Sequence, residues 1–186
     1  MSFTSVKNNK IMKTSEFTIR QETPDDLAEA YTLIQTAFET AKVKDGTEQD
    51  FAAELRRCDK FIPELSLVAE ANGRLIGHIM LTKTFVKQPD GAHFESLLAA
   101  PLSVALEWRD RGVGSALMRE GLRIAEEMGY RAAFLVGDPG YYERFGFRST
   151  AAYGIRSQAD IPPQFVMVRE LTPGALDGVS GVGDFC

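Results

Sequence analysis

The chain has 186 residues, of which 44% are hydrophobic and 25% charged, and its formal net charge is -5. These values are typical of a globular protein with one domain and a sizeable core. The acidic balance argues against a nucleic-acid binder that relies on a basic surface, and it favours a cationic partner such as an amine.

The two cysteines, Cys58 and Cys186, predict neither a disulfide framework nor a metal cluster. Cys58 falls in a helical pattern and is expected to be a small core residue. No apolar run approaches the ~20 residues that span a bilayer, and residues 1–13 lack the apolar core of a signal peptide. The expected compartment is therefore the cytoplasm, without a membrane partner.

Three regions follow from the pattern of apolar residues along the chain. Residues 1–15 are polar and are expected to form a disordered leader. Residues 16–171 carry the periodic patterns of one folded domain, and residues 172–186 form a Gly-rich tail that is expected to wrap irregularly or to act as a linker. Within the domain, alternation over 17–21 predicts a strand, and Thr23 and Pro24 predict the start of a helix.

A second helix is expected from Thr47 to the break at Pro63. Two apolar runs, 65–71 and 74–82, flank Asn72-Gly73, a pair that favours the positive φ angles of a tight hairpin turn. With a third strand over 94–106, they predict an antiparallel meander.

An Arg/Gly turn follows the third strand and opens a helix from Gly112 to Met128. Gly112 and Gly114 permit a sharp turn and a close backbone approach, while the helix presents unpaired N–H groups and its positive dipole end. Arg109 and Arg111 add guanidinium groups, which suit phosphate oxygens. Together these features predict a site for a pyrophosphate-bearing ligand.

Other glycine motifs fit this turn less well. The dinucleotide fingerprint GxGxxG requires a third glycine where this chain has Leu117, and the phosphate-loop pattern requires a Gly-Lys-Ser/Thr ending that is absent here. A nucleotide-binding oxidoreductase is kept as a rival interpretation, and it predicts that the chain binds a dinucleotide.

After the helix come a buried strand over 132–136, a short aromatic helix over 141–147 that breaks at Gly146, and a final strand over 165–171. The sequence Arg109-Asp-Arg-Gly-Val-Gly matches the pattern Arg/Gln-x-x-Gly-x-Gly/Ala, and Tyr142-Glu-Arg-Phe-Gly-Phe matches Tyr-x-x-x-Gly-Phe. In this order and spacing, the two motifs resemble the GNAT superfamily of N-acetyltransferases. The string GDPGYYERFGF is similar to the YhbS-like subgroup.

The resemblance implies a mixed α/β fold whose central sheet is mostly antiparallel, is flanked by helices, and has splayed fourth and fifth strands. It also implies acetyl-CoA as co-substrate, no metal, and direct acetyl transfer to a primary amine in a ternary complex. By the same resemblance, the backbone from Leu102 to Val104 pairs with pantetheine, and the Val104 N–H points toward the thioester carbonyl. The pyrophosphate is surrounded by Arg109, Arg111, Gly112, Val113, Gly114 and Ser115.

Two further roles are carried over from the family: Asp138 lies near the pantetheine, and Tyr142 is the general acid. A phenol of pKa ~10 can donate to a thiolate whose conjugate acid is near ~8.5. Glu70, Glu95 and His78 are the candidates for a base that deprotonates the amine, and none of them is preferred.

The acceptor stays open between a small amine, an amino acid, an antibiotic and a peptide amine, and a homodimer is compatible with the sequence. The alternative function is a non-catalytic module that binds or senses acyl-CoA.

Overall fold

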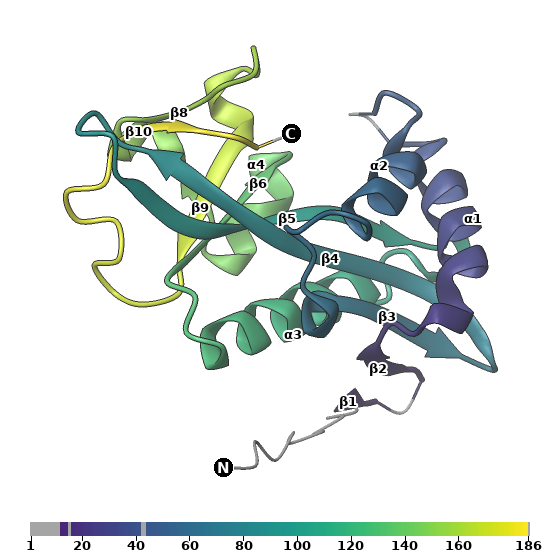
Figure 1. The fold of residues 1–186 in the computed structure, drawn as a ribbon. Helices are drawn as coiled ribbons and strands as arrows, with labels where there is room; N and C mark the ends of the chain where they lie inside the picture. Colours follow the sequence, from purple (N-terminus) through teal and green to yellow (C-terminus); the bar gives the residue numbers. More distant parts are fainter. Residues whose placement is uncertain (1–11, 15, 42–43, 186) are drawn as a thin grey trace.

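The computed structural model describes residues 12–14, 16–41 and 44–185 (Figure 1). Residues 1–11 and 15 of the expected leader lie outside these ranges. The helices and strands are β1 (Met12–Lys13), β2 (Thr18–Gln21), α1 (Leu27–Phe38), α2 (Glu48–Leu55), β3 (Ser66–Ala71), β4 (Arg74–Lys87), β5 (His93–Val104), α3 (Val113–Glu127), β6 (Ala132–Val136), α4 (Pro139–Tyr142), β7 (Arg148–Ser149), β8 (Ile155–Ser157), β9 (Val166–Glu170) and β10 (Gly181–Gly183).

One mixed sheet runs through the molecule in the order β1-β2-β3-β4-β5-β6-β9-β7, and β10 pairs with β4 and β8 beside this path. Neighbouring strands are antiparallel except for β5 with β6 and β8 with β10. The strands expected as fourth and fifth are β5 and β6. The predicted fold class, a mostly antiparallel mixed sheet flanked by helices, is confirmed.

The helices cover opposite faces of the sheet (Figure 1). On one face, α1 and α2 pack against β3 and β4 through Val68 and Met80. On the other face, α3 packs so closely that a Cβ added to Gly77 of β4 would lie 2.8 Å from side-chain atoms of Val113 and Leu117. The largest core cluster therefore lies between α3 and the sheet.

The hairpin between β3 and β4 forms at the predicted dipeptide. Asn72 and Gly73 have φ angles of 52° and 74°, the left-handed values that a two-residue hairpin turn requires. Strand β4 continues to Lys87, five residues beyond the predicted end at 82, because its second half pairs with β5 on one side and β10 on the other.

The C-terminal segment is part of the packed structure. Strand β10 pairs antiparallel with the end of β4, and Phe185 stacks on Phe134 of β6 at a centroid distance of 4.6 Å. Leu176 and Phe185 belong to a second core cluster with residues of β5, β6 and β9. The glycines of this segment supply the turns that bring these side chains onto the sheet.

Cys58 differs from expectation, because it is exposed. Helix α2 ends at Leu55, so Cys58 lies in the following turn and no longer on the buried stripe of the helix. Its thiol donates a weak hydrogen bond back to the carbonyl of Leu55.

Candidate active site

Strands β5 and β6 separate after a short parallel contact. Two consecutive residues of β5, Leu97 and Leu98, have partners in β6, whereas the pairing of β5 with β4 continues to Val104. Between these points β5 carries one residue more than β4, near Pro101, which is a β-bulge. Because a bulge bends its strand, it turns the last part of β5 away from β6.

The separation leaves one backbone edge of β5 without a strand beside it. The N–H of Ala105 donates to the carbonyl of Ile76 on the β4 side. Since backbone polar groups alternate along a strand, the N–H and C=O groups of Val104 and Leu102 point to the opposite side, which is the open edge. These are the residues that the resemblance assigns to pantetheine.

The turn before α3 is built from two left-handed residues. Asp110 and Gly112 have φ angles of 57° and 82°. The first backbone bond of α3 within the described chain runs from the Ala116 N–H to the Gly112 carbonyl, and no side chain caps the helix. The N–H groups of residues 113–115 are therefore free to bind an anion at the positive end of a helix of 15 residues.

The two arginines of the turn direct their guanidinium groups to different places. Arg109 donates to the Ala37 carbonyl at 2.6 Å and to Thr40 Oγ1 at 2.7 Å, so its side chain ties the turn to the end of α1. The Arg111 guanidinium lies over the Trp108 ring, with its Cζ 4.0 Å from the ring centroid. Its Nη2 lies 3.5 Å from Glu16 Oε2. The Arg111 side chain is exposed, whereas the Arg109 guanidinium is held by its two hydrogen bonds to the end of α1.

Two tyrosines of α4 lie beside the start of α3. A Cβ at Gly114 would lie 2.8 Å from the Tyr141 hydroxyl, so a larger residue there requires the tip of this tyrosine to shift. Tyr142 packs over Gly137 at the end of β6, where an added Cβ would lie 2.3 Å from its ring. Both rings contact the same core cluster as Leu102 and Val104. A Cβ added to Gly114 would also lie 3.4 Å from Val104 Cγ2, so the open edge, the turn and Tyr141 adjoin one another.

Burial raises the pKa of Tyr142 above the usual value near 10, and the neighbouring Tyr141 and Asp138 act in the same direction. The phenol therefore stays protonated at neutral pH and is available as a donor. Asp138 is exposed, and its carboxylate accepts a hydrogen bond from the Gly140 N–H at 3.0 Å, which caps α4. Its position at the end of β6 places it at the mouth of the split between β5 and β6.

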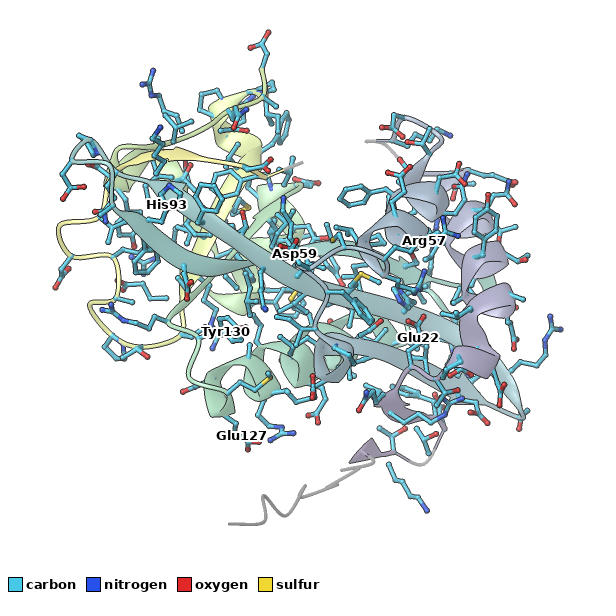
Figure 2. All side chains as sticks on the ribbon, in the orientation of Figure 1. Glu22, Arg57, Asp59, His93, Glu127 and Tyr130 are labelled. Carbon is cyan, nitrogen blue, oxygen red and sulfur yellow. The ribbon has the colours of Figure 1, made fainter. Side chains whose placement is uncertain are left out.

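A buried charged cluster lies on the other face of the sheet, next to α2. Glu22, labelled in Figure 2, follows β2 and binds Arg56 through two hydrogen bonds of 2.6 and 2.9 Å. Ser66 Oγ donates to the same carboxylate at 2.8 Å, and His78 Nε2 lies 3.3 Å from it. Three separate segments thus meet at one carboxylate whose side chain is 3% exposed.

The charges in this cluster follow from its burial and its partners. Burial by itself raises the pKa of Glu22, but hydrogen bonds from His78 and Arg56 outweigh it and lower the pKa to about 2. Burial lowers the pKa of His78 more than Glu22 raises it. At neutral pH the cluster therefore holds an ionised Glu22–Arg56 pair and a neutral imidazole.

His78 is the cross-strand neighbour of Ser103 on β5. In the described structure, His78 Nδ1 and Ser103 Oγ are buried and have no protein hydrogen-bond partner. Because Ser103 lies between Leu102 and Val104, this polar pair lies directly behind the open edge of β5.

The other two candidate bases are in different surroundings. Glu70 binds Arg20 at 2.8 and 3.0 Å, and Arg20 also binds Asp26, so this carboxylate belongs to an ion-pair network at the β2–β3 edge. Glu95 is exposed on β5. Neither of them lies in the segment of β5 that forms the open edge.

In the part of the chain that the structure describes, His, Cys, Asp and Glu side chains do not gather in groups of three or more suited to a metal ion. The same residues include no helix that is both long and apolar enough to cross a bilayer.

Comparison with known proteins decides the family. The model of the acetyltransferase (GNAT) domain matches residues 18–150. The chain belongs to the GNAT family of acetyltransferases. An Escherichia coli K12 protein named as an uncharacterized N-acetyltransferase, YhbS, is 32% identical over 168 residues, which are 90% of this chain and 95% of the relative.

Solved GNAT structures agree with this assignment. The crystal structure of Escherichia coli YhbS in complex with CoA has 28% identity and a TM-score of 0.83, and the alignment covers 94% of this chain and 92% of that chain. A GNAT acetyltransferase from Brucella melitensis in complex with acetyl-CoA has 28% identity and a TM-score of 0.75, with 93% and 97% covered.

Within this GNAT domain, sequence reasoning missed two features. Tyr141 was not singled out, although the GNAT motif includes its neighbour Tyr142 and the pair Tyr-Tyr precedes a turn glycine. The buried pair of Glu22 and Arg56 was missed as well, because residues 34 positions apart give no local signal.

Proposed function

We propose that the chain transfers the acetyl group of acetyl-CoA to a primary amine, directly and within a ternary complex. The observation that carries this proposal is the continuity of the open β5 edge with the unpaired N–H groups at the start of α3. A thioester ligand with a pyrophosphate needs these two features side by side. The complexes of YhbS with CoA and of the Brucella melitensis protein with acetyl-CoA support the same ligand.

The backbone does most of the binding in this proposal. Leu102 and Val104 present N–H and C=O groups to the amides of pantetheine, as an added strand would. The N–H groups of Val113, Gly114 and Ser115 bind the pyrophosphate, and Arg111 can approach it from the Trp108 ring. Because these donors are fixed by the sheet and the helix, the thioester is held with little loss of backbone freedom.

Two groups of the chain act on the reacting atoms. The Val104 N–H donates to the thioester carbonyl, whose oxygen gains negative charge when the amine attacks. The Tyr142 phenol, which is protonated at neutral pH, donates its proton to the sulfur as the C–S bond breaks, and the proton that the amine loses on forming the amide bond passes to water, from which the phenol is restored. The amine enters from the side of the sheet that carries α1 and α2, and its class is open between small molecules and peptides.

Release of the CoA thiol tests the function. The purified chain is incubated with acetyl-CoA and a panel of primary amines, and free thiol and acetylated amine are measured together. We expect thiol release that requires both the chain and an amine, with intersecting initial-rate patterns for the two substrates. Parallel patterns would contradict direct transfer, because they report a covalent enzyme intermediate. Binding of acetyl-CoA without turnover of any amine would favour the non-catalytic acyl-CoA module.

A further inference from the structure

A cavity of about 460 Å³ lies between α3 and the segment that follows α4. Its wall includes four arginines, Arg119, Arg123, Arg144 and Arg169, together with Glu126 and Phe145. We call this cavity the arginine groove. It collects positive charge on a chain whose net charge is -5.

The arginines of the groove differ in whether their guanidinium N–H groups already have hydrogen-bond partners. Glu120 holds Arg123 at 2.7 and 2.9 Å, and Arg169 donates to the Phe145 carbonyl at 3.0 Å. Arg119 and Arg144 pair with no carboxylate in the described ranges.

The guanidinium groups of these two arginines lie over aromatic rings. Arg119 is 5.3 Å from the centroid of Phe145, and Arg144 is 4.6 Å from that of Tyr141. Ring contacts of this kind fix the planes and leave the N–H edges free.

The groove also adjoins the proposed CoA site. Arg144 stacks on Tyr141, whose hydroxyl lies against Gly114 in the first turn of α3. Arg119 follows Gly114 by five residues on the same helix, a rise of about 8 Å along its axis. An anion in the groove would therefore lie within reach of a nucleoside attached to the pyrophosphate at the turn.

We propose that the arginine groove binds a phosphate group. Guanidinium groups with free N–H edges bind phosphate through paired, charge-assisted hydrogen bonds. Glu120 and Glu127 pair with Arg123, so the charges that an anion would meet in the groove are chiefly those of Arg119 and Arg144. The phosphate can come from the 3′-phosphate of the CoA molecule bound at the turn, which rests on the proposed function, or from a separate phosphate compound.

Paired ligands distinguish the two sources. Calorimetry measures the affinity of CoA and of dephospho-CoA, which lacks the 3′-phosphate, for the wild-type chain and the double variant Arg119→Gln/Arg144→Gln. Inorganic pyrophosphate is then added to each protein saturated with CoA, which blocks the turn, and the melting temperature is recorded. The matched control is Arg57→Gln/Arg74→Gln, which removes the same charge at exposed positions outside the groove (Arg57 is labelled in Figure 2).

If the groove binds the 3′-phosphate of CoA, wild type and control bind CoA about tenfold more tightly than dephospho-CoA, because one charge-assisted hydrogen bond contributes about this much. The groove variant then binds CoA and dephospho-CoA equally. For a separate source, CoA and dephospho-CoA bind equally to the wild type, and pyrophosphate raises the melting temperature of wild type and control but not of the groove variant. If neither difference is seen, or if the control loses it as well, the proposal is overturned.

Failure of the proposed function gives a different result. In that case neither CoA nor dephospho-CoA binds to any of the proteins. The pyrophosphate arm, run without CoA, then decides the groove on its own, since a stabilisation that depends on Arg119 and Arg144 supports it and its absence overturns it.

Discussion

Replacing Glu22 with glutamine removes the charge from the buried cluster beneath α2 and keeps the shape of the side chain. The wild-type carboxylate is 3% exposed and accepts hydrogen bonds from Arg56 and Ser66. In the variant, the Arg56 guanidinium, whose side chain is 11% exposed, loses its counter-ion. Breaking a buried pair from one side typically costs about 3–5 kcal/mol.

The lowered pKa of Glu22 expresses the same interaction as a dependence of stability on pH. Hydrogen bonds from His78 and Arg56 overcome the effect of burial and lower the pKa from 4.5 to about 2. This difference corresponds to about 3 kcal/mol of folding free energy at neutral pH. Because the pKa is lower in the folded state, this stability is fully present above pH 4.5 and is lost as the pH falls toward 2.

Urea denaturation of wild type and Glu22→Gln, from about pH 6 to about pH 3, tests this account. At pH 6 we expect the variant to be less stable by about 3 kcal/mol, and the difference to shrink as the pH falls. The control is Glu70→Gln, since Glu70 also binds an arginine but is 32% exposed, so its loss costs about 1 kcal/mol or less. A Glu22→Gln effect as small as that of the control, or one that does not change with pH, would refute the reasoning.

Three other substitutions test the site and the packing. Tyr142→Phe should lower turnover about 10²- to 10⁴-fold with little change in the Kd of acetyl-CoA by calorimetry, and wild-type turnover would remove Tyr142 from the chemistry. Gly114→Ala places a Cβ 2.8 Å from the Tyr141 hydroxyl, which is the movable end of that side chain, and the motif accepts alanine at this position; we expect acetyl-CoA affinity to fall less than about tenfold, and a larger loss by calorimetry would show that Tyr141 cannot shift. Phe185→Ala should cost about 3–5 kcal/mol in urea denaturation, and a cost near zero would contradict packing of Phe185 on Phe134.

Features set by neighbouring residues could be predicted from the sequence. The Asn72-Gly73 turn and the glycine before α3 have positive φ angles. These angles could be predicted because few residues other than glycine and asparagine tolerate them. The turn at α3 could be related to a phosphate ligand for the same reason, since its glycines, its arginines and the helix start lie within a few residues of one another.

Features set by contacts distant in sequence could not be predicted. Strand β10 has three residues and forms because its backbone pairs with β4 on one side and with β8 on the other. Glu22, Arg56 and His78 meet only after three segments pack together. Arg109 has the sequence position of a phosphate ligand. Its guanidinium nevertheless donates to the Ala37 carbonyl at the end of α1, and the two residues are 72 positions apart in the sequence.

Calorimetric titration of acetyl-CoA into the wild-type chain and into Gly112→Glu tests the central claim most directly. Gly112 has a φ angle of 82° at the start of α3, where a glutamate would add strain and place a negative charge beside the N–H groups of residues 113–115. We predict saturable binding to the wild type and none to a folded Gly112→Glu variant. Equal binding to both proteins would show that the turn does not hold the pyrophosphate, and no binding to the wild type would contradict the proposed function itself.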